Sequence, residues 1–228
     1  MDLKIPVLST KILVLALIAS ISVISVPANA AGLKKVKRTG TWEATFLLRN
    51  QSSETYTGAG DFSDDSISFD SDTGFGFSFG YNFDQHLSLG LEFTGNRPRY
   101  TAEFNDGNGD PQTLRREADA YATMFKLRYH FLDGPIQPFV SGGLGWTGID
   151  SNIGTGNSYC SGYYYWYCYE DTFGTWGVGY TAEVGVRMDL PNRLFLRGSY
   201  GRQWSTKSIG SESTPSFDVG SLELGVTF

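Results

Sequence analysis

The sequence has few of the residues from which active sites and metal centres are usually built. Its 228 residues include two histidines and two cysteines. A structural zinc site needs about four such ligands, and the sequence contains no nucleophile elbow, zinc-protease motif or phosphate-binding loop. This scarcity predicts a protein that is not an enzyme, with no catalytic residues, no metal site and no cofactor.

Charged residues are also scarce, and their balance is acidic. They make up 18% of the chain, which has a formal net charge of −6, whereas about 25% is typical. Nucleic-acid binding needs a basic patch, so we expect no nucleic-acid partner. One basic cluster, Lys34, Lys35, Lys37 and Arg38, lies within residues 31–40. We expect this segment to be a solvated N-terminal tail; contact with anionic lipid headgroups is the alternative.

Long apolar runs are absent beyond the N-terminal segment. Residues 12–24 form an apolar run of about 13 residues, preceded by Lys4 and Lys11 and followed by Ala28-Asn29-Ala30. A membrane-spanning helix needs roughly 20 residues, whereas this combination is typical of a cleavable signal peptide. We therefore expect a signal peptide over residues 1–30 and no spanning helix after it.

Glycine and aromatic residues are abundant, with 28 glycines and 15% aromatics. They occur in segments where large apolar residues alternate with small or polar ones, which is the period of a β-strand. The alternating segments are 42–49, 75–83, 87–94, 121–131, 140–147, 176–190, 194–201 and 221–228. No convincing helical stripe occurs after the signal peptide, so the sequence predicts eight strands.

The connections between these strands alternate between short and long. Residues 84–85, 133–135 and 191–192 are short and rich in turn formers, whereas 51–72, 95–118, 149–173 and 204–216 are long and polar. Outer-membrane barrels have short periplasmic turns and long extracellular loops. The tryptophans at 146, 176 and 204 would lie beside the long loops, and Trp42, Phe83, Phe131 and Phe228 beside the turns, as two aromatic belts.

The last strand, Leu222-Glu223-Leu224-Gly225-Val226-Thr227-Phe228, resembles the C-terminal signal that the barrel-assembly machinery reads. With the strand and loop layout, the chain resembles the small eight-stranded outer-membrane proteins (OmpA/OmpX-like and opacity-type barrels). The resemblance implies an all-β, antiparallel up-and-down transmembrane barrel over residues 41–228, preceded by a periplasmic tail at 31–40. It also implies a Gram-negative outer membrane, with outer-membrane lipids and lipopolysaccharide as partners.

Two features limit the resemblance. No sequence follows Phe228, so we expect no peptidoglycan-binding domain of the kind that OmpA carries. Gly40-Thr41-Trp42 resembles the first strand of the lipocalins, which are soluble barrels. However, the polar face of the strands carries too few charges for a solvated surface, which favours the membrane barrel.

The polar face contains five acids and five bases that would point into the lumen. They are Glu43, Arg49, Glu92, Lys126, Arg128, Glu183, Arg187, Asp189, Arg197 and Glu223. Side chains fill an eight-stranded barrel, and buried charges are tolerated when they are paired. We expect an ion-paired plug, with His130 hydrogen-bonded in the lumen or at its rim and His86 solvated on a turn. A gated narrow pore, or an OmpW-like conduit for small hydrophobic solutes, is the alternative.

The third long segment contains YCSGYYYWYCYE, with Cys160 and Cys168 as the only cysteines. Export through an oxidising periplasm predicts a disulfide between them. It would hold Tyr163, Tyr164, Tyr165, Trp166 and Tyr167 at a hairpin tip. These side chains would either be displayed for contact with a ligand of unknown identity or pack on the other loops.

The second long segment contains a partial calcium-loop pattern, Asp106-Gly107-Asn108-Gly109-Asp110. Pro111 stands where such loops need glycine, so a solvated turn is the default. The function expected from the sequence is that of a non-enzymatic barrel whose loops serve surface interaction or envelope integrity.

Overall fold

The computed structural model describes residues 37–57, 66–105, 110–161, 167–206 and 215–228. Within these ranges, only the backbone is described for residues 155–161, 167–171 and 173. The predicted signal peptide lies outside the described residues. Among the residues described, no helix is long and apolar enough to cross a membrane.

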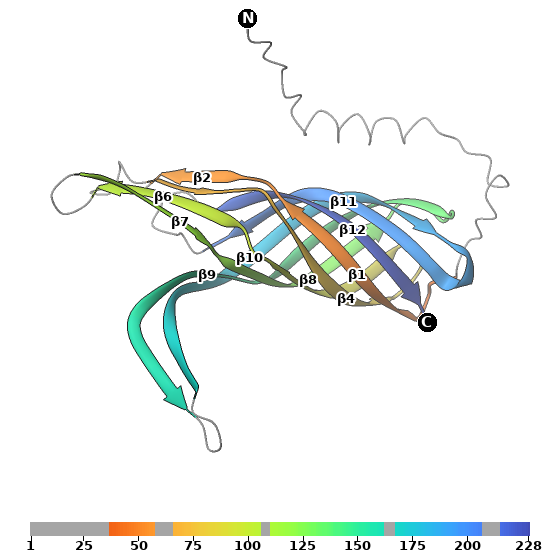
Figure 1. Ribbon diagram of the computed structural model, residues 1–228. Helices are drawn as coiled ribbons and strands as arrows, with labels where there is room; N and C mark the ends of the chain where they lie inside the picture. Colours follow the sequence, from red (N-terminus) through yellow and green to blue (C-terminus); the bar gives the residue numbers. More distant parts are fainter. Residues whose placement is uncertain (1–36, 58–65, 106–109, 162–166, 207–214) are drawn as a thin grey trace, which may run out of the picture. The chain divides into compact units, whose positions relative to one another are not determined.

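Eight antiparallel strands form a closed barrel, in the order β1-β12-β11-β10-β9-β8-β5-β4, and β1 pairs with both β12 and β4 to close it (Figure 1). This confirms the predicted fold. The barrel strands are β1 Thr41–Gln51, β4 Asp72–Asn82, β5 Leu87–Asn96, β8 Asp119–His130, β9 Ile136–Ser161, β10 Tyr167–Asp189, β11 Leu194–Ser205 and β12 Ser216–Thr227.

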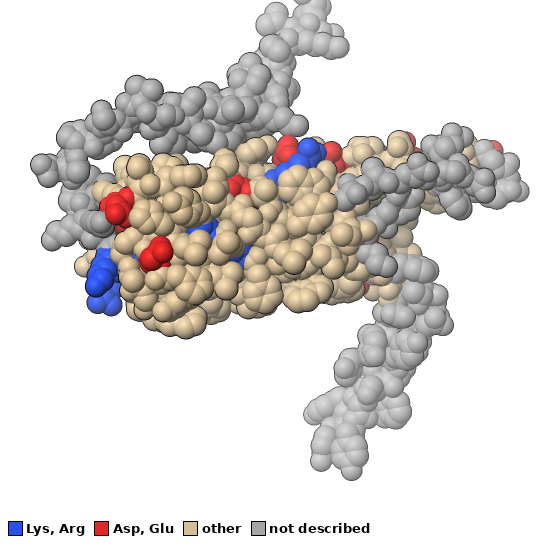
Figure 2. Space-filling view, turned by 180° about the vertical axis from the view of Figure 1, so that it is seen from behind, with Lys and Arg blue, Asp and Glu red and all other residues tan. Residues whose placement is uncertain are grey.

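The two faces of the barrel wall have the polarity expected in a membrane. Large apolar side chains point outward: Phe77 and Phe79 of β4 are each 52% exposed, and Leu127 of β8 is 50% exposed. Charged side chains cover little of the barrel face seen in Figure 2. The polar residues that alternate with the apolar ones are buried inside the barrel. A barrel in water would need the reverse arrangement, so the lipocalin alternative is wrong.

Inward glycines make room for the two aromatic rings of the interior. Phe139 and Phe195 are both fully buried among the charged side chains. A Cβ atom at Gly225 would overlap the Phe195 ring, and one at Gly185 would overlap the Phe139 ring. These close approaches require residues without a side chain, which accounts for glycine at both positions.

A second sheet was not predicted from the sequence. It has the order β2-β3-β6-β7, with β2 Glu54–Thr57, β3 Ser66–Phe69, β6 Arg99–Asn105 and β7 Pro111–Glu117. These strands come from the segments 51–72 and 95–118, which the sequence indicated as loops. Their apolar positions are too few to give a clear alternation, and their pairing becomes favourable only when one face is covered.

The face of this sheet packs against the beginning of β12. Tyr56, Phe69 and Tyr100 are buried with Phe217 and Val219. The ring centroids of Tyr56 and Phe69 lie 5.9 and 6.1 Å from that of Phe217. The Tyr56 hydroxyl also donates a hydrogen bond to the Ser216 carbonyl at 2.9 Å. The second sheet is therefore anchored to the loop end of the barrel by an aromatic cluster.

Strands β9 and β10 continue past the barrel as a long paired hairpin (Figure 1). Their register runs from Met188↔Ile136 to Tyr167↔Ser161, with irregularities near Thr172. The expectation that one strand ends near Trp146 and the next begins near Trp176 is wrong. Both tryptophans lie inside strands, because the Gly-, Ser- and Thr-rich sequence beyond them pairs with itself.

We expect the substitution Phe125→Arg to reduce the free energy of unfolding by about 2–4 kcal/mol, the cost of a cation at the bilayer midplane. Phe125 is an outward residue near the middle of β8 and is 47% exposed. The measurement is urea unfolding in lipid vesicles. Thr113→Arg on the exposed strand β7 is the control. An equal loss in both variants would contradict the lipid-facing assignment of Phe125.

Candidate functional site: the ion-paired lumen

Six of the eight barrel strands supply charged side chains to the lumen. All ten charged residues named from the sequence lie there, and none is more than 7% exposed. They occupy alternate positions on their strands. Because successive side chains of a strand point to opposite faces, all of them lie on the inward face. Their pairing is decided by the closed barrel, since partners come from strands distant in the sequence.

One group of ion pairs lies toward the loop end of the lumen. Glu92 of β5 contacts Arg49 of β1 at 2.9 Å and Lys126 of β8 at 2.8 Å. Lys126 also contacts Glu183 of β10 at 2.8 Å. The Arg49 guanidinium donates a second hydrogen bond to the side-chain oxygen of Gln203, at 2.6 Å. Each cation therefore bridges groups on different sides of the lumen.

A second group lies toward the turn end. Glu43 of β1 accepts from Arg187 of β10 at 2.5 Å and from Arg197 of β11 at 2.9 Å. Arg197 also contacts Glu223 at 2.8 Å, and Arg187 contacts Asp189 at 2.7 Å. The Arg187 guanidinium stacks 3.8 Å from the centroid of the Phe195 ring.

The two groups are joined through Arg128. Its Nη2 atom lies 3.6 Å from Glu92 and 3.8 Å from Glu223, one carboxylate from each group. The charged side chains therefore form a continuous network across and along the lumen. Removing one partner would leave a charge buried without compensation, which costs far more than breaking a pair on the surface.

One buried cation was not predicted from the sequence. Arg38, expected in a solvated tail, is 1% exposed, and its Nη2 atom donates to the Gln85 carbonyl on the β4–β5 turn. Burial first, and then the neighbouring Arg187, lower its pKa to about 10. Arg38 precedes β1, so no strand alternation could have indicated that it points inward.

The two histidines occupy different environments near the turns. His86 lies on the β4–β5 turn, with Nε2 3.5 Å from a carboxylate oxygen of Asp133 on the next turn. His130 is fully buried against the Phe139 ring, 5.4 Å between centroids. Neither ring nitrogen of His130 has a hydrogen-bond partner among the described residues, so the expectation of a hydrogen-bonded His130 is wrong.

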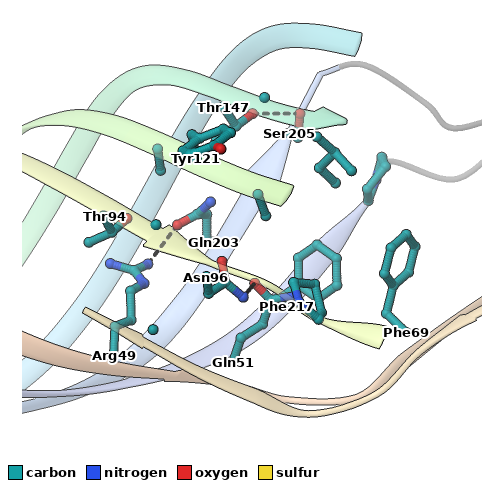
Figure 3. A pocket seen from close by; sticks show the side chains of 18 of the residues that line it. Arg49, Gln51, Phe69, Thr94, Asn96, Tyr121, Thr147, Gln203, Ser205 and Phe217 are labelled. Carbon is teal, nitrogen blue, oxygen red and sulfur yellow. Dashed lines mark hydrogen bonds between the residues drawn. The ribbon is translucent and has the colours of Figure 1, made fainter. Parts of the chain in front are cut away.

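A pocket opens at the loop end of the lumen, above Arg49 (Figure 3). The pocket is partly open to solvent. Its polar lining includes Gln51, Asn96 and Gln203, and its apolar lining includes Phe69 and Phe217. Of this lining, Arg49 was singled out from the sequence as an inward charge and Trp204 as part of an aromatic belt. The other residues were not, because they meet only when the barrel closes.

The remaining predicted site residues are placed only in part. Residues 106–109 of the partial calcium pattern and residues 163–166 of the display set lie outside the described residues. Tyr167 begins β10, and the backbone register places Cys168 directly opposite Cys160. The disulfide stays a prediction. Within the described ranges, no group of three or more His, Cys, Asp or Glu residues could hold a metal ion.

The last residue is paired with the first strand. The Phe228 N–H donates to the Trp42 carbonyl, and the Trp42 N–H donates to the Phe228 carbonyl, both at 2.9 Å. The Phe228 side chain points outward and is 59% exposed. Its reading by the assembly machinery stays a prediction.

Comparison with known proteins agrees with this geometry. The sequence profile of the family described as "Outer membrane protein beta-barrel domain" matches residues 16–228. The chain belongs to this family. This outer-membrane barrel has no match among curated protein sequences.

Among solved structures, this outer-membrane barrel is similar to OprG from Pseudomonas aeruginosa, with 13% identity and a TM-score of 0.54, over 85% of this chain and 98% of that one. It is also similar to Neisserial surface protein A, with 14% identity and a TM-score of 0.46, over 83% of this chain and 96% of that one. At 13% identity, the likeness to OprG shows a shared fold alone.

We expect Lys126→Met to destabilise the outer-membrane barrel by about 3–5 kcal/mol, because it leaves Glu92 and Glu183 buried without their nearest cation. Urea unfolding in lipid vesicles measures the loss. Arg99→Met is the matched control, since it breaks an exposed ion pair with Glu117 that is worth about 1 kcal/mol or less. Similar small losses in both variants would show that the lumen pairs do not hold the barrel together.

Proposed function

We propose that the protein is a non-enzymatic outer-membrane scaffold whose lumen is closed by an ion-paired plug and whose extracellular structures make surface contacts or support envelope integrity. The observation that carries the proposal is the network of buried ion pairs between strands on different sides of the lumen. Glu43–Arg187 and Lys126–Glu183 are examples that join strands not paired in the sheet.

The plug follows from the cost of separating these groups. A pore would need several pairs to open together, each leaving charged groups without a partner in a narrow space. Lys126 alone would have to leave both Glu92 and Glu183, each at 2.8 Å. Aqueous channels belong to barrels of 16–18 strands, so the eight strands provide no space around the network through which ions would pass.

The pocket at the loop end favours the solute conduit as a second candidate. Phe69, Ile149 and Phe217 form part of its apolar lining, and the amides of Asn96 and Gln203 form part of its polar lining. The two kinds of lining offer contacts for the apolar and the polar parts of a small amphipathic molecule. Below it, Arg49 is held by Glu92 and Gln203, so passage inward would require either the plug or the barrel wall to open.

The purified protein in planar bilayers is expected to show little or no steady conductance, because the charged network fills the lumen. The double variant Glu92→Ala/Lys126→Ala removes the centre of the network and is expected to give measurable current steps. Heat-modifiable gel mobility checks that both proteins are folded. Large stable steps in the unaltered protein would refute the plug, and uptake of a hydrophobic solute into vesicles would favour the conduit.

The surface role is supported by ordered structure outside the barrel. The second sheet and the β9–β10 hairpin are paired strands rather than loose loops. Strand β7 exposes Thr113, Arg115 and Arg116. Binding residues are often carried by segments that a rigid scaffold positions, and here the barrel is that scaffold.

Replacing residues 151–173 with a short turn is expected to leave the barrel folded, because pairing below Asp150 and Gly174 is unaffected. We expect adhesion of expressing cells to be lost while their detergent resistance is kept, which would assign the hairpin to surface contact. Loss of detergent resistance alone would assign it to envelope integrity. If neither property changes, the hairpin has no part in either role.

A further inference from the structure

Among the described residues, the buried charges of the whole lumen sum to one excess positive charge once Arg38 is counted. Together with Arg38, the buried interior contains six bases and five acids, none more than 7% exposed. They are Arg38, Arg49, Lys126, Arg128, Arg187, Arg197, Glu43, Glu92, Glu183, Asp189 and Glu223. The carboxylates that act most strongly on Arg38, those of Glu43 and Asp189, already pair with Arg187 and Arg197.

The Arg38 guanidinium is only partly satisfied. Its Nη2 atom donates to the Gln85 carbonyl, but Nε and Nη1 have no hydrogen-bond partner in the part of the chain that the structure describes. Asp84 lies on the same turn, but it is exposed and its Oδ1 atom accepts the N–H groups of His86 and Leu87. No described carboxylate forms an ion pair with Arg38.

A buried guanidinium without a counter-charge is costly. Its lowered pKa, about 10, still leaves Arg38 protonated at neutral pH. It therefore cannot remove the cost by losing its proton, as a buried lysine often does. A negative charge from outside the chain would remove it.

Near the same turn, two other buried donor side chains lack partners among the described residues, and so does one buried acceptor, Asn82 Oδ1. Both ring nitrogens of His130 are unpaired, and the His130 backbone N–H donates to the His86 carbonyl, one residue after the carbonyl that Arg38 contacts. The Ser88 hydroxyl, 3% exposed, is unpaired and lies two residues further along β5. His130 also interacts electrostatically with Arg38.

We propose that the periplasmic end of the lumen binds one monovalent inorganic anion of the halide class, held by Nε and Nη1 of Arg38 and by the N–H and O–H groups of His130 and Ser88. The single excess charge sets the valence of the anion. The donors are all N–H or O–H groups, the type that halides accept. The site does not depend on the surface role or on whether the lumen conducts.

Crystals soaked in bromide test the site directly. We expect an anomalous difference peak within hydrogen-bonding distance of Arg38 Nη1 in the unaltered protein and none in Arg38→Gln. Density that water alone explains, with no bromide, would overturn the proposal. Because the unaltered protein decides this outcome, the test stands even if Arg38→Gln does not fold.

Thermal unfolding in detergent, followed by tryptophan fluorescence, tests the energetic role. Replacing gluconate with chloride at fixed ionic strength is expected to raise the midpoint by roughly 3–6 °C for each tenfold of chloride above its dissociation constant. Arg99→Gln, an exposed arginine of β6, should keep this response, and Arg38→Lys, with fewer donors, should weaken it. An equal response in Arg38→Gln, or a larger response to phosphate than to chloride, would overturn the halide assignment.

Discussion

The structure depends on the requirement that charges enclosed in a narrow barrel must be paired within it. Water cannot solvate ten buried charged side chains in this space, so each must find its partner inside the barrel. Contacts such as Glu43–Arg187 and Lys126–Glu183 meet this requirement across the lumen. They also tie strands that share no backbone hydrogen bonds, so the charge network and the closed sheet stabilise each other.

The same constraint explains where the molecule is irregular. Arg38 enters the lumen from outside the strand pattern and leaves the interior with a cation that has no acidic partner among the described residues. At the other end the network stops at Arg49, and a pocket begins. Among the described residues, the interior as a whole is therefore short of one negative charge, whereas its loop end contains space that side chains do not fill.

The sequence predicted the barrel well because the signals that define it are local. In segments such as 75–83 and 121–131, the alternation of large apolar with small or polar residues indicates which face of the strand meets lipid. This indication does not depend on which strand lies beside it. The second sheet was missed because SISF and ETYT are too short to show a period. Tyr56, Phe69 and Tyr100 are buried only because Phe217 of β12 meets them. A contact between such distant segments produces no recognisable pattern in the sequence of either segment.

By itself, the sequence determined the eight strands, the polarity of their two faces and the identity of ten inward charges, since each depends on the period of a single strand. Only the tertiary structure decided which acid meets which base, that Arg38 is buried, that the ring nitrogens of His130 have no partner among the described residues, and that the outer segments form a sheet and an extended hairpin. These features depend on distances between strands far apart in the chain, which are set when the barrel closes.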